Sequence, residues 1–251
     1  MKQLLYLLIA LLLFVSSCKK NSMNNCPSAV TLSATNVAPT IGDAFTITAN
    51  KESDFDIFYW SGPAGYFETS NSNEVAITDA KYSNRGWYYC TKAGSECSTT
   101  AQDSIFVDVK LKQEAAPCNI TNNFFSSSNL VYDITLTSVT KHFDPTWNAV
   151  GVYGRDAYGR PSLQVLFNSY NGNVEPLDGV YITKDASVFD VTDEYNVVSV
   201  SFLYDSDYFH CHPDQKVYVS HVNGKIQVTF CDMVFSDGTY LTTCKAKMTE
   251  L

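Results

Sequence analysis

The triplet His210-Cys211-His212 holds the residues of this sequence that could most readily do chemistry. On an extended strand the two histidines would point to the same face, because side chains alternate along a strand. Imidazole nitrogens bind zinc, and two of them side by side could supply half of a tetrahedral site. The remaining ligands could come from His221, Cys231 or Asp214. A metal-dependent hydrolase that uses this region is therefore one hypothesis for the function.

The competing interpretation is that the cysteines of this region form disulfides and that the histidines lie in a loop before Pro213. The spacing matches no zinc signature of the C-x-x-C or H-E-x-x-H kind. Four cysteines pair readily into two bridges in an oxidising compartment. Cys211 could pair with Cys231 or with Cys244. We expect Cys211 to pair with Cys231, and Cys118 to pair with Cys244.

Other catalytic signatures are missing from the sequence. It contains no G-x-S-x-G motif, no phosphate-binding loop and no dinucleotide fingerprint. The four histidines come with no recognisable nucleophile. Acidic clusters occur at 54–56, 190–194 and 205–207, and turn chemistry explains most of them. We therefore expect no catalytic residue and no cofactor, and the protein is more readily understood as a non-enzymatic binding, adhesion or structural module.

Aromatic side chains form the second candidate site. Several lie in or near predicted loops, and exposed Tyr and Trp anchor protein partners and glycans well because they combine a large apolar area with a polar group. The alternative is that they fill the core of a β-rich fold. The candidates for a binding surface are Trp147, Tyr153, Tyr158 and Tyr170, with Phe143 and Tyr208 close by in the sequence.

The first residues carry an export signal. Leu4 to Val15 is an unbroken apolar run after a basic start at Lys2, which is typical of a signal peptide. The run is shorter than the roughly 20 residues that a membrane-spanning helix needs. Val15-Ser16-Ser17-Cys18 resembles the bacterial lipobox. The resemblance implies cleavage before Cys18 and a stable membrane anchor through lipid on that cysteine.

The composition predicts an all-β protein. Aromatic residues make up 14% of the chain, and the segments between turns are rich in Val, Ile, Thr and Tyr, which suit pleated sheets. Apolar residues alternate with polar ones, and turn signals recur about every ten residues, as in sandwiches and barrels. The net charge of −9 argues against nucleic acid as a partner.

A polar segment at 112–117, which ends in Pro117, separates two strand-rich blocks of the chain. The sequence thus predicts a signal peptide at 1–17, a lipidated tether at 18–26, a β-domain at 27–111, a linker at 112–117 and a second β-domain at 118–251. Strands are expected at 29–34, 44–49, 56–61, 74–78, 86–91 and 104–111 in the first domain. In the second they are expected at 130–139, 149–155, 162–167, 179–183, 197–204, 216–221, 225–235 and 239–248.

Two motifs of the first domain resemble immunoglobulin-like modules. Trp60-Ser-Gly-Pro-Ala-Gly-Tyr-Phe67 and Asn84-Arg-Gly-Trp-Tyr-Tyr-Cys90 are similar to the strand-C and strand-F motifs of Ig-like or PKD-like domains in extracellular Bacteroidota proteins. The resemblance implies a two-sheet sandwich with Trp60 buried and Tyr88 in a tyrosine corner.

The second strand of this domain has no cysteine, so the usual bridge to Cys90 is absent and the core must rest on other side chains. These are Trp60, Phe45, Ile47, Ile77 and Tyr88. In such a sandwich the chain start and the last hairpin lie at one end. We therefore expect Cys26 to pair with Cys97 and Cys90 to stay buried and reduced, and a Cys90 to Cys97 bridge is the alternative.

The second domain is expected to be a sandwich or a flattened barrel. Its stretch from Gly224 to Phe235 resembles C-terminal β-domains of uncharacterised Bacteroidota lipoproteins. Asn223-Gly224 predicts a tight hairpin. The residues after Cys18 include no early acidic residue, and in that family this favours an outer-membrane lipoprotein that faces the periplasm. The expected partners are the membrane, through the lipid, and a protein or a glycan.

Overall fold

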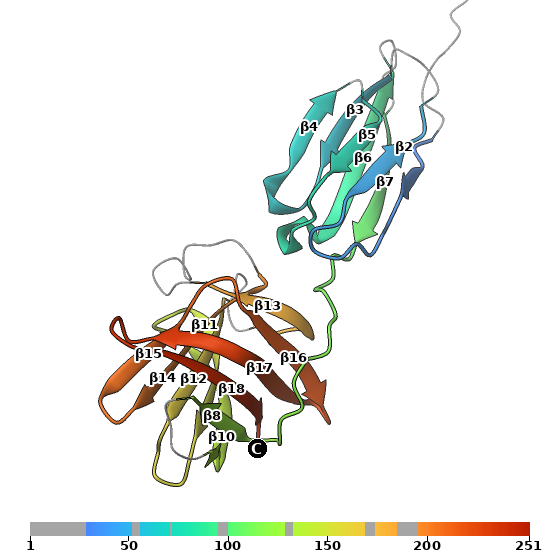
Figure 1. Ribbon diagram of the computed structural model, residues 1–251. Helices are drawn as coiled ribbons and strands as arrows, with labels where there is room; N and C mark the ends of the chain where they lie inside the picture. The colour runs from blue at the N-terminus through green and yellow to red at the C-terminus, as the bar shows by residue number, and fades with distance from the viewer. Residues whose placement is uncertain are drawn as a thin grey trace, which may run out of the picture.

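The computed structural model describes residues 29–51, 56–70, 72–94, 100–128, 133–168, 174–184 and 195–251. Apart from two single turns of 3-10 helix, η1 (Pro63–Gly65) and η2 (Tyr82–Asn84), all its regular elements are strands. They form two β-domains joined by an extended segment (Figure 1). The prediction of an all-β chain is therefore confirmed. In the described residues, no helix has the length and apolar character needed to span a membrane.

The first domain is a sandwich of two antiparallel sheets with the strand order of an Ig-like fold. One sheet has the order β1-β2-β5 and the other the order β4-β3-β6-β7. The strands are β1 (Leu32–Ala34), β2 (Phe45–Ala49), β3 (Asp56–Ser61), β4 (Phe67–Ser70), β5 (Glu74–Ile77), β6 (Gly86–Gly94) and β7 (Thr100–Val107).

The core of the first domain lies between these sheets. Trp60 and Tyr88 are fully buried, and the ring of Phe45 meets that of Tyr88 edge-on. Tyr88 Oη donates a hydrogen bond to Asn84 O at 3.1 Å, which confirms the tyrosine corner. Cys90 is a buried thiol in the same core.

The second domain is built on one long, curled sheet. Its hydrogen-bonded order is β10-β11-β12-β14-β13-β16-β17-β18-β8-β9, and β15 pairs with both β14 and β17. The strands are β8 (Phe124–Ser127), β9 (Ile134–Thr135), β10 (Ser138–Asp144), β11 (Ala149–Arg155), β12 (Ser162–Asn168), β13 (Gly179–Thr183), β14 (Val197–Tyr204), β15 (Asp207–Cys211), β16 (Lys216–Val222), β17 (Lys225–Ser236) and β18 (Leu241–Thr249).

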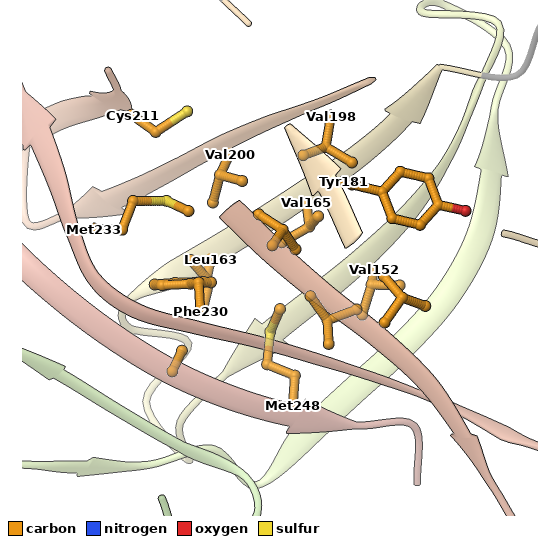
Figure 2. Packing of buried hydrophobic residues seen from close by; sticks show 14 of the residues in the cluster. Val152, Leu163, Val165, Tyr181, Val198, Val200, Cys211, Phe230, Met233 and Met248 are labelled. Atoms are coloured by element: carbon orange, nitrogen blue, oxygen red, sulfur yellow. The ribbon is translucent and has the colours of Figure 1, made fainter. Parts of the chain in front are cut away.

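The sheet bends back on itself into a flattened barrel. β15 bridges β14 and β17, which closes one side. On the other side Leu251 N donates to Val139 O of β10 at 3.1 Å. The side chains enclosed between the two halves include many valines, with large residues such as Phe230, Met233 and Met248 between them (Figure 2). Burying this single apolar cluster provides the main driving force for folding the domain.

The disulfide of the second domain joins Cys118 to Cys231, with 5.9 Å between their Cα atoms. The predicted pairs Cys211–Cys231 and Cys118–Cys244 are wrong, and Cys211 and Cys244 are buried thiols. The reason is the direction of the side chains. Cys211 and Cys244 point into the barrel core with the apolar residues of their strands. Cys231 lies at a bulge between Phe230 and Met233, both of which point inward, so its side chain is left on the outer face.

The hairpin between β16 and β17 has the predicted turn. Asn223 and Gly224 have φ values of 52° and 77°, and Val222 pairs with Lys225 across them. Two successive positive φ values define the type I′ turn, whose twist matches that of the strands. The hairpin prediction is therefore confirmed.

The segment that joins the domains packs against both. Val109 belongs to the core of the first domain, whereas Leu111, two residues later, is buried in the core of the second. Val180 N donates to Lys112 O at 2.8 Å. The ring of Tyr82 from η2 stacks on that of Tyr195, with centroids 3.9 Å apart. The domain boundary thus falls between Val109 and Leu111, and the stacked rings of Tyr82 and Tyr195 add a second contact between the domains.

Candidate functional site

A row of outward-facing side chains crosses five strands of the second domain. The strand register places Thr140 of β10, Tyr153 of β11, Gln164 of β12, Ser201 of β14 and His210 of β15 opposite one another in turn. Directly paired residues share a face of the sheet. The inward positions of β12 and β14 are filled by Leu, Val and Phe, so the polar residues between them point out. The side chains of this row form the centre of the candidate site.

A pocket of about 180 Å³ is set into this face. Its base holds side chains that are almost fully buried, and its rim carries two aromatic rings, Trp147 and Tyr208, that are about half exposed. The lining residues are Trp147, Gln164, Leu166, Ser199, Ser201, Tyr208 and His210. The volume is well below the roughly 300 to 1,000 Å³ of sites for drug-sized ligands. It suits a single ring or side chain.

Hydrogen bonds hold the polar side chains of the pocket in place. Ser201 Oγ and Tyr208 Oη lie 2.9 Å apart. Ser201 Oγ also donates to Gln164 Oε1 at 3.4 Å, and Gln164 Nε2 donates to Tyr153 Oη at 3.4 Å. The Tyr208 ring meets the His210 ring at a centroid distance of 4.6 Å. The pocket therefore presents hydroxyl and amide groups whose directions are set before a ligand arrives.

Gly151 makes room for the ring of Tyr153 beside the pocket. A Cβ atom at Gly151 would come within 2.5 Å of that ring, so only glycine allows the ring to lie over the strand. The ring stacks almost parallel on His142, at 4.2 Å and 7°. Tyr153 Oη donates to Asp144 Oδ2 at 3.3 Å.

The charges of Tyr153 and Asp144 are set by this arrangement. Burial raises the pKa of the Tyr153 phenol, so it stays a neutral donor. Burial acts to raise the pKa of Asp144, but hydrogen bonds from Thr146 and Tyr153 lower the pKa by more than burial raises it. The net shift is downward, so the carboxylate stays ionised.

The residues predicted for a binding surface are distributed unevenly. Trp147 lines the pocket, and Tyr153 lies in the row beside it. Tyr158 is 84% exposed, but it lies in the turn after β11, at the end of that strand opposite Trp147. Tyr170 lies outside the described residues. Of the predicted binding residues that the structure describes, Trp147 and Tyr153 therefore lie at or beside the pocket, and Tyr158 does not.

The predicted metal ligands do not converge. His210 points into the pocket, whereas His212 follows the end of β15 and is exposed. Across the described ranges no three His, Cys, Asp or Glu side chains come close enough to hold a metal ion. The other predicted positions, Cys18, Cys26 and Cys97, lie outside the residues that the structure describes.

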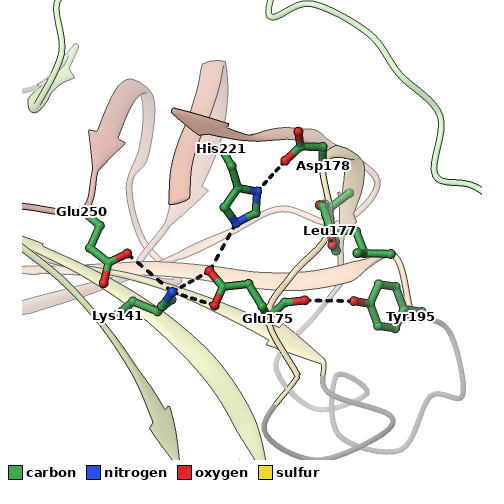
Figure 3. Close-up of polar contacts among 8 residues, drawn as sticks. Lys141, Glu175, Leu177, Asp178, Tyr195, His221 and Glu250 are labelled. Carbon is green, nitrogen blue, oxygen red and sulfur yellow. Dashed lines mark hydrogen bonds and ion pairs between the residues drawn. The ribbon is translucent and has the colours of Figure 1, made fainter. Parts of the chain in front are cut away.

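His221, a candidate third ligand, contacts two carboxylates at the junction of the domains. Its Nδ1 lies 2.5 Å from Asp178 Oδ1 and its Nε2 lies 3.2 Å from Glu175 Oε1. Lys141 Nζ contacts the same Glu175 carboxylate at 2.5 and 2.7 Å (Figure 3). Burial acts to raise the pKa of Glu175, but the hydrogen bonds from Lys141 and His221 outweigh it and the pKa falls.

A wider cleft of about 420 Å³ lies next to this network, between the two domains. The charged side chains that line it contact one another: Arg85 Nε lies 2.7 Å from Asp108 Oδ1, and Lys110 also pairs with Asp108. Two of its carboxylates, Glu175 and Asp178, already contact His221. Each set of ion pairs lies on one side of the cleft, with Arg85, Asp108 and Lys110 in the first domain and the His221 network in the second.

Sequence reasoning missed four lining residues, Gln164, Leu166, Ser199 and Ser201. The only signal is that Gln164, Ser199 and Ser201 alternate with Val, Leu and Phe in strands whose inner face is apolar. Ser199 and Ser201, two positions apart in Val197–Tyr204, indicate a polar patch on the outer face. They do not by themselves indicate a pocket.

The chain resembles several solved structures of Ig-like proteins at low similarity, whereas no protein-family model and no curated protein sequence matches it. The second Ig-C2 domain of human Fc-receptor like A is 21% identical, covers 33% of this chain and 96% of its own length, and has a TM-score of 0.29. The three N-terminal domains of the bacteriophage RB49 outer capsid protein Hoc are 13% identical over 84% of this chain and 71% of that one, with a TM-score of 0.30.

Murine CEACAM1b is 9% identical over 88% of this chain and 98% of its own, with a TM-score of 0.28. The assignment of the first domain to an Ig-like sandwich rests on its own strand order, the buried Trp60 and the tyrosine corner at Tyr88.

Proposed function

We propose that this protein is a non-enzymatic binding module of a bacterial cell envelope and that its second domain binds a neutral carbohydrate. The pocket between Trp147 and Tyr208 carries the proposal. Aromatic rings at the rim can lie against the apolar face of a sugar ring, and fixed hydroxyl and amide groups at the base can bond to its hydroxyls.

The charge of the pocket supports a neutral ligand. Among its described lining residues there is no Asp, Glu, Lys or Arg. A sulfated or carboxylated glycan would find no cation there, and the net charge of −9 would repel it. A neutral sugar avoids both costs.

The same lining supports binding without hydrolysis. Most glycoside hydrolases use two carboxyl groups that flank the scissile bond at a separation of roughly 5 to 10 Å. The described lining offers one histidine and no carboxylate. Asp144 is held by the hydroxyl of Tyr153 and by the Thr146 amide, outside the pocket.

We further propose that lipid on Cys18 anchors the chain in the outer membrane, facing the periplasm. The support is the apolar run Leu4 to Val15 followed by the lipobox-like Ser16-Ser17-Cys18, and the absence of early acidic residues. Mass spectrometry of the protein extracted from membranes tests this. A diacylated N-terminal cysteine is expected, and Cys18→Ser should release the protein into the soluble fraction. An unmodified Cys18 in a membrane-bound protein would contradict the anchor.

Binding to an array of neutral and anionic oligosaccharides, followed by titration calorimetry on the best ligand, tests the carbohydrate proposal. We expect neutral glycans to bind. Trp147→Ala and Tyr208→Ala should each weaken binding at least about tenfold, since aromatic side chains that anchor a ligand contribute about 2 kcal/mol or more.

Tyr158→Ala is the matched control, because it also removes an exposed aromatic ring but at the other end of β11. Its affinity should equal that of the wild type. The proposal fails if no neutral glycan binds, or if all three variants weaken binding equally.

A further inference from the structure

The outer face of the sheet β4-β3-β6-β7 in the first domain exposes a group of aromatic rings. Phe67 is 72% exposed, Trp87 51%, Tyr89 41% and Tyr59 39%. These fractions amount to about two whole aromatic side chains, on the order of 400 Å² of surface. That is as large as the largest apolar patches of ordinary monomers, which are often functional.

The strand register shows that these rings share one face. Phe67, Ser61, Tyr89 and Ser104 lie opposite one another across β4, β3, β6 and β7. The neighbouring row is Thr69, Tyr59, Thr91 and Gln102. Trp87 extends the patch beside Phe106, with ring centroids 5.4 Å apart. We call these residues the aromatic face.

The aromatic face carries no charge. Each of its positions is aromatic, Ser, Thr or Gln, and the nearest charged pair, Arg85 and Asp108, lies at its edge. Arg85 sits over the Phe106 ring at 5.5 Å while its Nε contacts Asp108. On a chain with a net charge of −9, a whole sheet face without charge is unusual.

From this face we infer that the protein forms a symmetric dimer by packing the aromatic face against that of a second copy. A twofold contact places the same patch on both sides, so a patch that carries charge of one sign would face charge of the same sign. A patch of rings and hydroxyls has no such conflict and can be complementary to itself. Recognition of a different protein would instead favour complementary charges, which the face lacks.

The size of the face sets the expected strength. Four strands about 4.8 Å apart and up to nine residues long give a face on the order of 400 to 500 Å². Two copies would bury about 1,000 Å² in total, the low end of specific interfaces. The dimer should therefore dissociate on dilution.

Sedimentation velocity of the chain that starts at Lys19 tests the inference, because every described contact lies after that residue. We expect a dimer that grows between about 1 and 300 µM protein. Raising NaCl from about 20 to 500 mM should strengthen it, because salt screens the repulsion between two acidic chains while the contact itself is uncharged.

Trp87→Glu should weaken dimerisation at least tenfold, since it buries two like charges at the contact. Trp147→Glu is the matched control: it changes the same residue type and adds the same charge, but in the second domain. It should leave the dimer intact while it abolishes glycan binding, so the two proposals can fail separately. A Tyr89→Glu variant repeats the test if Trp87→Glu does not fold.

Three results would overturn the dimer. One is a monomer at every concentration and salt, as expected if a glycan or another protein occupies the face. Another is equal weakening by Trp87→Glu and Trp147→Glu. The third is an association that high salt abolishes.

Discussion

Removing the disulfide between Cys118 and Cys231 should destabilise the second domain by several kcal/mol. The two residues are 113 positions apart. The chain-entropy relation gives about 4.8 kcal/mol for closing a loop of that length, and measured losses for native bridges are about 2 to 5 kcal/mol. We therefore expect the Cys118→Ser, Cys231→Ser double variant to lose about 3 to 5 kcal/mol in the free energy of unfolding.

The loss should be confined to one domain. The bridge ties the chain just after the junction to the bulge of β17, and none of its residues touches the first core. Hydrogen exchange followed peptide by peptide in increasing urea gives the free energy of opening for each domain. Peptides of β8, β17 and β18 should lose protection, while those of β3 and β6 keep theirs.

The control variants are Cys211→Ala and Cys244→Ala. Each removes one buried thiol and leaves the bridge intact, so each should cost less than the double variant. If the double variant loses less than about 1 kcal/mol, the entropic reasoning is wrong. A non-reduced peptide map that links Cys211 to Cys231 would refute the pairing itself.

Three further predictions follow from single contacts. Tyr88→Phe keeps the buried ring but removes the bond to the Asn84 carbonyl, and thermal unfolding should show a loss of about 1 kcal/mol. Gly151→Ala should displace the Tyr153 ring, lowering stability by about 1 to 3 kcal/mol and weakening glycan binding in calorimetry. Burial raises the pKa of the Cys90 and Cys244 thiols from 9.0 to about 11, so native protein should react slowly with alkylating reagents at pH 8 and rapidly in urea. Since the unfolded chain releases these protons first, stability should fall as the pH rises from 9 towards 11.

The strands that the sequence predicted are those with apolar alternation. Val197–Tyr204 matches the structure at both ends, and its Val198 and Val200 lie in the barrel core. The sequence missed Phe67–Ser70, Phe124–Ser127 and Asp207–Cys211. It also misplaced two strands: those expected at 104–111 and 130–139 lie at Thr100–Val107 and Ser138–Asp144. The missed strands are short and contain Ser, Glu or Asp at several positions, so pairing with neighbouring strands, and not local pattern, makes them strands.

The wrong disulfide pairs could have been avoided in part, because the strand pattern indicates which way some of the cysteines point. Cys244 keeps step with Thr242, Ala246 and Met248, all of which point into the core. Cys231 is out of step with Phe230, so its side chain leaves the core. Counting alternation along these two predicted strands would have shown that Cys244 points into the core and Cys231 away from it, whereas Cys211 lies in a strand that the sequence did not predict.

The site was only partly predictable for a different reason. Trp147 was found because an aromatic ring in a turn is visible in the sequence. Gln164, Ser201 and His210 come from three strands, and only their register brings them together. That register depends on β15, a strand the sequence did not predict.

The docked junction between the domains has a consequence for ligands with repeated units. Leu111 and the stacked rings of Tyr82 and Tyr195 leave the two domains little freedom to rotate. Two chains joined through their first domains would hold their two pockets at one fixed spacing. A polymer whose repeat matches that spacing would meet the second pocket at high effective concentration, and its avidity could exceed single-site affinity by about 10² to 10⁴. Such a dimer would therefore select a polymer by the spacing of its repeats as well as by the identity of its sugar.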